Sequence, residues 1–377
     1  MRKSVPPEIC SIELYAFSRI ILGFTNAASL AIGPLYLSEI SPKEFRGKIG
    51  MTTGLSVQFG SLVASLIAMP NFLGDEKLWW IIYFGEACLL FLTLIIFFFF
   101  HESPEFLAKS KKDSEAMKSI LFFYQCSKLE ASEVLEEIKA ENDLMEKSSK
   151  IGLFGIWKDY ETRQRTIIAV IVMFATVFSG VAAINAFAVD ILESAGLSSL
   201  ISSYINVGLC FIAFIASCAS IFIIDKFSRR FLLLFTLIGL FACNIGIGVL
   251  LFIHQKFSSS NIISYLLIIF FSTFLTLFSI GPGPLSFFIT AELNDINSRS
   301  SAQSWTSVTS MSTRTLLVAG FFPLKTILNS AGAYSLLFLF PVAFSTLYLY
   351  FFLPETKNKS QKELSDDLKK RSDRIFK

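Results

Sequence analysis

The sequence predicts an all-α membrane protein, and three observations support this fold class. Hydrophobic residues make up 53% of the 377 residues and charged residues only 17%, against about 25% charged residues in a typical soluble domain. The apolar residues gather in long stretches, each close to the roughly 20 residues that a helix needs to cross a bilayer. These stretches are too long for the strands of a membrane barrel, so the chain is predicted to form a helical bundle in a lipid bilayer.

Nine apolar stretches are long enough to cross a membrane, which predicts a multi-pass protein. They lie at 14–38, 48–70, 78–100, 166–190, 203–224, 231–253, 262–290, 301–325 and 333–353. The first three are expected to form an incomplete N-terminal half, at 1–100. The last six are expected to form a complete C-terminal half, at 166–353.

Two charged segments lie outside the predicted spans. In the linker between the halves, 101–165, Val134, Leu135 and Ile138 stand among many acidic residues, a pattern typical of short amphipathic helices. The tail, 354–377, ends in a basic segment from Lys369 onward. We expect this basic segment, from Lys369 onward, to be disordered.

The distribution of positive charge predicts the orientation of the spans. Of the 33 Lys and Arg, 26 lie in alternate connections. These connections are 39–48, 101–165, 225–230, 291–300 and the tail after 353. Because Lys and Arg favour the cytoplasmic side, these connections and the C-terminus are predicted to be cytoplasmic.

Charged residues repeat at a fixed offset along the chain. Glu39, Arg46 and Glu102 are each followed, 253 positions later, by Glu292, Arg299 and Glu355. Internal repeats of apolar helices are typical of transporters built from related halves. The offset carries the last three spans onto the first three, but the middle three have no counterpart in the printed sequence. We therefore expect about three helices to be missing before residue 1, either through a truncated gene model, a splice form or a real deletion.

The repeated charges lie at the ends of spans, and a further charged cluster lies between 225 and 230. Opposite charges there can pair when one end of a carrier is closed and must separate when it opens. We predict a charge network that controls this opening. Its members are Glu39, Arg46, Glu102, Asp225, Arg229, Arg230, Glu292, Arg299 and Glu355. The alternative is that they are ordinary charges that set the topology.

The segment Gly281-Pro282-Gly283-Pro284 lies inside the predicted span 262–290. Proline removes a backbone donor and clashes with the preceding turn, so a kink or break is predicted. Broken helices commonly form transporter sites or gates, although a purely structural kink is the competing interpretation.

Arg314 lies near the middle of the predicted span 301–325, where several Ser and Thr make the helix polar. A charge at this depth is costly and usually faces a cavity or a partner. Glu86 and Asp190 are candidate counter-ions, and satisfaction by backbone carbonyls is an alternative.

No pattern in the sequence predicts an enzyme. The chain has two histidines and no CxxC pair among its six cysteines, so neither catalytic residues nor a metal site is expected. No nucleotide-binding loop indicates a cofactor, and the basic tail does not suggest nucleic-acid binding.

Several short motifs together resemble the sugar-porter branch of the major facilitator superfamily, and within it the animal facilitated glucose transporters (solute carrier family 2). They occur in family order over nearly the whole chain. They are RIILG at 19–23, PLYLSE at 34–39 with RG at 46–47, ESP at 102–104, DKFSRR at 225–230, GPGP at 281–284, AEL at 291–293 and PETK at 354–357. The resemblance implies family helices 4–12 of a twelve-helix bundle in the plasma membrane. It also implies facilitated diffusion of a hexose or other small polar solute by alternating access.

The family's solute-contacting positions carry other residues in this chain. They fall on Ser65, Thr176, Ser279, Phe287, Ser310, Met311 and Arg314. Buried amides fix sugar hydroxyls by hydrogen bonds, and most of these amides are absent. Two alternatives therefore remain open: a transport-incompetent truncated or regulatory paralogue, and an organic-ion carrier of the same superfamily that uses Arg314.

Overall fold

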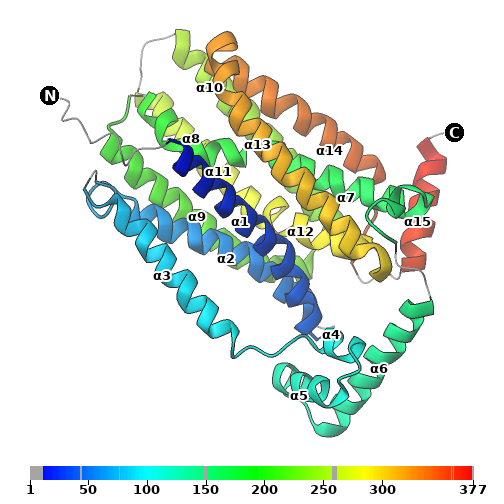
Figure 1. Cartoon of the computed structure of the whole chain (residues 1–377). Coiled ribbons are helices and arrows are strands. Elements are labelled where there is room, and N and C mark those ends of the chain that lie inside the picture. Colours follow the sequence, from blue (N-terminus) through cyan, green and yellow to red (C-terminus); the bar gives the residue numbers. More distant parts are fainter. Residues whose placement is uncertain are drawn as a thin grey trace.

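The computed structural model describes residues 12–375 apart from 43–44, 76, 148–150, 195, 257–260, 358 and 360. Three long helices come first: α1 (Ile12–Ile40), α2 (Arg46–Ile67) and α3 (Trp79–Phe97). We call them the N-terminal unit. Helix α2 packs against α1 and against the later helix α9 (Ser199–Lys226), whereas α3 lies at the edge of the molecule (Figure 1).

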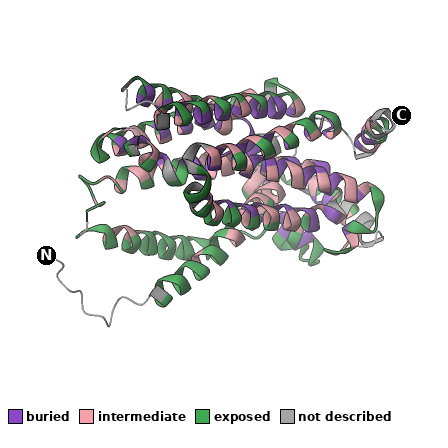
Figure 2. Ribbon diagram, turned by 90° about the horizontal axis from the view of Figure 1, so that it is seen from above, coloured by how far each residue is buried: buried purple, intermediate pink, exposed green. Residues whose placement is uncertain are grey.

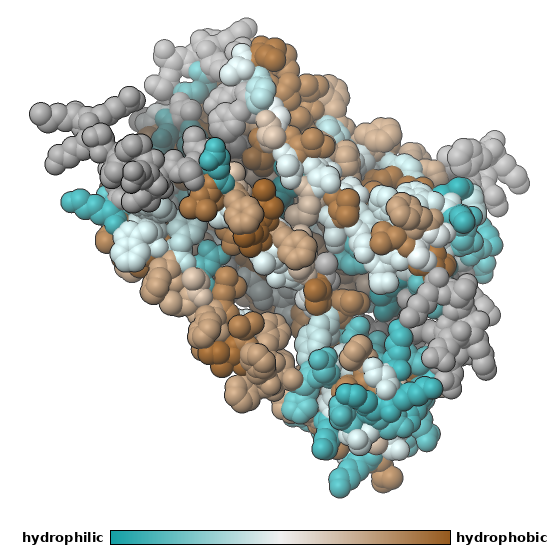
Figure 3. Space-filling model, in the orientation of Figure 1, coloured by the Kyte–Doolittle hydropathy of each residue, from teal (hydrophilic) through white to brown (hydrophobic). Residues whose placement is uncertain are grey.

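The helices α1 and α3 pack little against the rest of the protein. The apolar windows of α1 and α3 contain no buried residues, whereas 67% of the corresponding window within Tyr160–Ala186 is buried. Figure 2 shows the helix that follows the N-terminus exposed along most of its length. Figure 3 shows an apolar surface over α3, and the run Phe97–Phe100 at the end of this helix is exposed. These outward-facing side chains suit a hydrocarbon environment rather than water.

Three short helices occupy the predicted linker: α4 (Pro104–Lys109), α5 (Asp113–Tyr124) and α6 (Lys128–Lys147). Helix α4 begins at Pro104, and the Ser103 hydroxyl accepts the N–H of Phe106 at 3.1 Å, which caps its N-terminus. Their apolar faces meet in a small core around Ala116, Ile120 and Ala131. Their outer faces are hydrophilic in Figure 3.

The second group of long helices, the C-terminal unit, contains the main core of the protein. Its helices are α7 (Tyr160–Phe178), α8 (Val181–Ser194), α9 (Ser199–Lys226), α10 (Arg229–Lys256), α11 (Asn261–Ile280), α12 (Pro282–Leu293), α13 (Ile296–Tyr334) and α14 (Phe340–Phe352). A 3₁₀ turn, Gly155–Trp157, precedes α7, and a π-helical turn, Ser335–Leu339, joins α13 to α14. Buried Leu, Ile and Phe side chains from these helices form one continuous cluster.

The predicted span 166–190 overlaps the apolar segment Tyr160–Ala186, and the chain turns within this segment, between α7 and α8. Gly180 has a φ of +102°, a left-handed conformation that glycine adopts without steric cost. The amide of Asn244 holds this turn from α10: its Nδ2 donates to the Ser179 carbonyl at 2.7 Å. The hydroxyl of Tyr334 donates to Asn244 Oδ1 at 2.7 Å, so the buried amide is satisfied on both sides.

Eight helices of the described chain are long and apolar enough to cross a membrane. They cover every predicted span except 301–325. That segment lies in α13, a helix of 39 residues. The many Ser and Thr of α13 lower its mean hydropathy, so it is not among the eight. The all-helical membrane fold is confirmed, while the count of nine spans stays a prediction.

The prediction that the segment from Lys369 onward is disordered is wrong, because this segment as far as Ile375 belongs to helix α15 (Gln361–Ile375), which folds against the bundle. Leu364 and Leu368 lie one turn apart and are buried, 1% and 6% exposed, in the main core cluster. Residues spaced by four positions share one face of a helix. Because charged residues surround these two leucines in the sequence, the composition of the tail does not reveal that one face of its helix is apolar.

Candidate functional site

The N-terminus of α10 is capped by a carboxylate from a distant part of the chain. The carboxylate of Glu355 accepts the backbone N–H groups of Arg229 at 3.0 Å and Arg230 at 3.2 Å. Burial alone would raise the pKa of Glu355, but these bonds, together with those from Lys357 and Ser228, outweigh it and hold the pKa below its ordinary value. A helix N-terminus carries unpaired N–H groups and a partial positive charge, so it stabilises this anion.

The side chain of Arg229 lies between α10 and α12. Its Nε is 3.6 Å from Glu292 Oε1, and its Nη1 donates to the Ile224 carbonyl at 3.0 Å. The guanidinium also lies 5.7 Å from the ring centre of Phe288. We call the four charged residues Arg229, Arg230, Glu292 and Glu355 the α10 cluster. The end of the bundle where this cluster lies is called the charged end.

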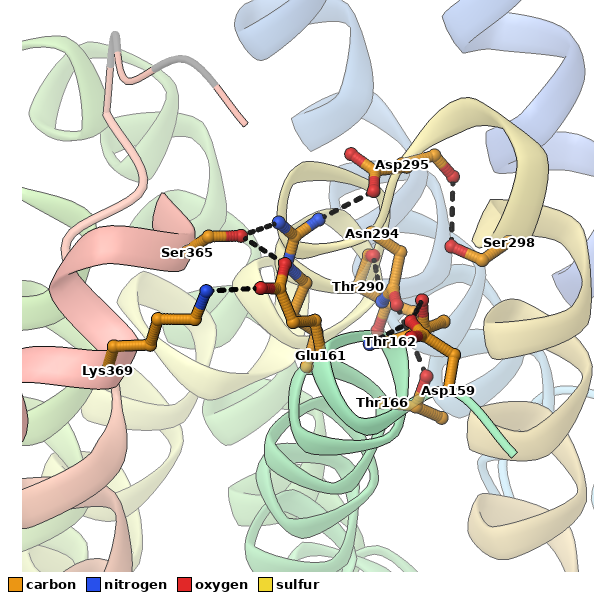
Figure 4. A network of polar contacts seen from close by, with 11 residues as sticks. Asp159, Glu161, Thr162, Thr166, Thr290, Asn294, Asp295, Ser298, Ser365 and Lys369 are labelled. Carbon is orange, nitrogen blue, oxygen red and sulfur yellow. Dashed lines mark hydrogen bonds and ion pairs between the residues drawn. The ribbon is translucent and has the colours of Figure 1, made fainter. Parts of the chain in front are cut away.

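A second polar network surrounds the first turn of α7, and we call it the α7 network (Figure 4). Arg165 is 4% exposed; its Nη1 pairs with Asp295 Oδ2 at 2.9 Å, and its Nη2 donates to the Ser365 hydroxyl. That hydroxyl donates to Glu161 at 2.9 Å, and Glu161 pairs with Lys369 at 2.6 Å. The α7 network therefore joins α7 to the connection before α13 and to α15.

The same turn of α7 is also held by hydrogen bonds that are not part of ion pairs. Asp159 caps α7 by accepting the N–H of Thr162 at 3.0 Å and its hydroxyl at 2.6 Å, which lowers the pKa of Asp159. Buried Thr166 donates to Asn294 Oδ1 at 3.2 Å. These bonds fix the start of α7 against the end of α12.

The predicted charge network is only partly gathered in the α10 cluster. Arg229, Arg230, Glu292 and Glu355 lie in that cluster. Glu39 is half-buried at the end of α1, Glu102 is exposed before α4, and Arg299 is half-buried in the first turn of α13. The side chains of Arg46 and Asp225 lie outside the described part of the chain.

The two units meet along one face of α2. A Cβ atom placed on Gly50 would lie 3.0 Å from the Phe288 ring, and one on Gly54 would lie 2.8 Å from Pro284 Cβ. Small residues four positions apart let membrane helices approach closely. We call this contact between α2 and α12 the seam. One turn further along α2, Gln58 Nε2 donates to the hydroxyl of Ser279, at the end of α11, at 2.6 Å.

The predicted break lies at the end of α11. The helix stops at Ile280 and restarts at Pro282, and Gly281 between them has φ −111° and ψ −99°. Gly281 also lies so close to α10 that an added Cβ would meet the Thr236 hydroxyl at 2.0 Å. The segment with Gly283 and Pro284 therefore turns toward α2 at a fixed position.

The predicted solute-contacting residues occupy different environments. Thr176, Ser279 and Ser310 are buried, and Ser65, Phe287 and Met311 are half-buried. Arg314 is exposed although it lies deep within α13. Within the described part of the chain it has no ion-pair or hydrogen-bond partner, neither Glu86 nor Asp190.

Several residues of these contacts were not singled out from the sequence. Arg165 precedes the apolar run of α7 and Gln58 interrupts the apolar run of α2. Each is therefore a polar residue next to or within an apolar stretch, and the sequence alone shows this. Ser365 and Asn244 carried no comparable signal, because their importance depends on partners 200 and 90 positions away.

Comparisons with known proteins agree with this architecture. The family described as "Sugar (and other) transporter" matches residues 6–368. The pig facilitated glucose transporter member 2 is 30% identical over 346 residues, which cover 90% of this chain and 63% of the pig protein. The chicken member 1 is 27% identical over 356 residues, covering 94% of this chain and 71% of that protein. The chain thus spans about two thirds of the length of these relatives.

Solved structures show the same fold. The proton:xylose symporter XylE of the major facilitator superfamily, bound to 6-bromo-6-deoxy-D-glucose, superposes with a TM-score of 0.72 at 20% identity, covering 90% of this chain and 70% of XylE. The inward-open XylE from E. coli gives 0.64 at 19% identity, covering 88% and 68%. The resemblance seen in the motifs is confirmed: this multi-pass membrane protein has a major facilitator fold, and the chain belongs to the sugar (and other) transporter family.

Proposed function

We propose that the protein is a membrane carrier for a sugar or a related small polar solute, working by facilitated diffusion and alternating access. The observation that carries the proposal is the seam between α2 and α12. There the two units touch through Gly50 and Gly54. Such a contact can separate as a rigid body without unfolding either helix.

The charged end supplies the contacts that would change as the carrier opens. Arg229 and Glu292, at 3.6 Å, lie on α10 and α12, close to Phe288 of the seam. A partly exposed ion pair contributes about 0–1 kcal/mol, and conformational states of such proteins differ by a few kcal/mol. Several such contacts together are enough to bias the balance between an open and a closed charged end.

The distribution of Lys and Arg supports a cytoplasmic position for the charged end and for the C-terminus. Glu39, Arg46, Glu102, Asp225 and Arg299 would complete the charge network there. The plasma membrane is proposed from the relatives, which are named facilitated glucose transporters.

The solute is proposed to bind between the units, near the middle of the bundle. Ser279 and the break at Gly281 lie there against α2. Ser65, Thr176, Phe287, Ser310 and Met311 would supply hydroxyl groups and apolar surface. These groups suit a neutral solute with several hydroxyls better than an ion.

Uptake into liposomes containing the purified protein tests the proposal. Radiolabelled hexoses, pentoses and polyols are offered one at a time, with empty liposomes as the control. We expect saturable uptake of at least one solute that stops at equilibrium and is unchanged when the proton gradient is collapsed. Accumulation driven by a proton gradient would contradict facilitated diffusion. A correctly folded protein that moves none of the solutes would contradict the carrier proposal and support a transport-incompetent paralogue.

Arg314 favours a second candidate function, an organic-ion carrier, because it is an exposed charge deep in α13 without a partner in the described chain. Under this function, Arg314→Gln abolishes the uptake of small organic anions. Arg163→Gln, at a cation–π contact with Tyr160 outside the proposed site, is the control and leaves that uptake unchanged. Uptake of neutral sugars that survives Arg314→Gln favours the first function.

A further inference from the structure

A patch of apolar side chains lies on the surface where the linker joins the C-terminal unit. Phe154 is 77% exposed, and Leu153 and Trp157 beside it are exposed as well. The indole ring of Trp305, on α13, packs nearly perpendicular to both aromatic rings, with centres 6.3 Å from Phe154 and 5.4 Å from Trp157. This edge-to-face arrangement is a favourable one for aromatic rings. We call Leu153, Phe154, Trp157 and Trp305 the aromatic patch.

The backbone that carries the aromatic patch is fixed to α13. The hydroxyl of Ser301 donates to the Ile151 carbonyl, and Nε1 of Trp305 donates to the Leu153 carbonyl, each at 2.9 Å. Ile156, in the same segment, is fully buried. The neighbouring apolar side chains nevertheless point outward, and a contiguous exposed apolar surface marks a site of interaction with a protein or a membrane.

The position of the aromatic patch along the bundle matches the edge of a bilayer. The apolar segment that can cross a membrane begins at Tyr160, three residues after Trp157. The last charged residue of α7 is Arg165, and an apolar run follows it from Ile167. Indole rings concentrate at this boundary in membrane proteins, because their apolar body and polar N–H suit the layer between hydrocarbon and water.

The charges next to the aromatic patch suit a negatively charged headgroup. Asp159 accepts the N–H of Thr162, and Glu161 pairs with Lys369, so the two nearest acids in the sequence are already engaged. Lys158 follows Trp157 directly and is exposed. Within the described residues it forms no ion pair. A cation at the membrane surface is attracted to anionic phospholipids.

We propose that the aromatic patch is a docking surface for the lipid bilayer at the charged end. Its rings lie in the interfacial layer, and Lys158 lies against the phosphate groups of anionic phospholipids. Because the patch joins the segment before α7 to α13, the bilayer holds the starts of these two helices at one depth. The inference concerns the lipid and not the solute, so it does not depend on the proposed function.

Tryptophan fluorescence of the full chain in liposomes tests the proposal. Trp79→Phe with Trp80→Phe leaves Trp157 and Trp305 as the emitting residues, and we call this double variant the parent. Phospholipids brominated at different depths of their acyl chains quench from the lipid side, and acrylamide quenches from water. We expect strong quenching by bromines near the headgroups, weaker quenching by bromines near the chain ends, and little quenching by acrylamide.

A substitution in the parent tests the contribution of Phe154. Phe154→Ser removes the most exposed side chain of the patch, so lipid quenching should fall, acrylamide quenching should rise and the emission should shift to the red. Phe106→Ser, at an exposed phenylalanine of the linker helix α4, is the matched control and should resemble the parent. Circular dichroism in detergent checks that both variants fold.

A second substitution tests the contact with anionic headgroups. Adding phosphatidylserine to phosphatidylcholine vesicles should strengthen lipid quenching of the parent, and Lys158→Gln should lose this increase. Lys118→Gln, at an exposed position of α5, should keep it. An increase that survives in Lys158→Gln would refute the headgroup contact.

The parent alone also decides the position of the aromatic patch, even if a further variant does not fold. Quenching by acrylamide without quenching by brominated lipid would place the patch in water. Quenching by neither would show that protein covers it. Either result would overturn the proposal, as would a folded Phe154→Ser variant that is quenched by brominated lipid as strongly as the parent.

Discussion

The carboxylate of Glu355 accepts the backbone N–H of Arg229 at 3.0 Å, so a residue that follows α14 caps the N-terminus of α10. Removing the charge while keeping the shape, with Glu355→Gln, should lower stability by about 1 kcal/mol, because the helix terminus loses its anion. Thermal unfolding in detergent measures this. Glu133→Gln, at an exposed position of α6, should have no effect and is the control.

The contribution of Glu355 should also depend on pH. Its pKa in the folded protein lies below the ordinary value, so its stabilising effect is full above the unfolded-state pKa of about 4.3. It is lost as the pH falls through the lower folded-state pKa. The stability gap between the wild-type protein and Glu355→Gln should thus be constant near neutral pH and shrink below about pH 4. A gap that stays constant at low pH would contradict the capping role.

Gly54 should tolerate no larger residue at the seam. An alanine Cβ would lie 2.8 Å from Pro284 Cβ, and overpacking of this kind typically costs about 1–3 kcal/mol. Gly60 on the same helix has open space around an added Cβ, so Gly60→Ala should be neutral or slightly stabilising. Thermal unfolding of the two variants provides the comparison, and equal melting temperatures would argue against close contact at the seam.

Helix α15 should depend on its two buried leucines. Leu364 is 1% exposed, and truncating a buried leucine to alanine typically costs about 2–5 kcal/mol. Leu364→Ala should therefore release α15 and speed hydrogen exchange over residues 361–375. Lys370→Ala, at an exposed position of the same helix, should leave exchange unchanged. Fast exchange of this segment in the wild-type protein itself would show that the helix is not docked.

Tyr334 should be needed for the turn between α7 and α8. Tyr334→Phe removes the donor to Asn244 Oδ1 and leaves that buried oxygen unpaired, at a cost of about 1–3 kcal/mol. Tyr265→Phe, at a side chain that is 63% exposed, is the matched control. A drop in melting temperature is expected for the first variant alone.

The sequence was sufficient to predict the helical membrane fold and the positions of most spans, because a long apolar run has few stable structures other than a membrane-spanning helix. Motifs around Glu292 and Glu355 also located part of the α10 cluster. The turn at Gly180 escaped prediction, since its stabilising partners, Asn244 and Tyr334, lie on helices distant in sequence.

The tail was misjudged for a similar reason. Composition weighs all residues equally, whereas the docking of α15 depends on Leu364 and Leu368 and on the ion pair between Lys369 and Glu161. Gln58 was visible as a polar interruption of an apolar run. Its contact with Ser279, however, spans 221 positions and depends on how the units pack.

The central claim is that the units move apart at the seam during transport. A cysteine pair, Gly50→Cys with Phe288→Cys, in a variant without the six native cysteines, tests it directly by uptake into liposomes before and after oxidation. We predict that the cross-link stops uptake and that a reducing agent restores it, while the Phe288→Cys single variant transports in both conditions. Full uptake with the cross-link in place would contradict the claim.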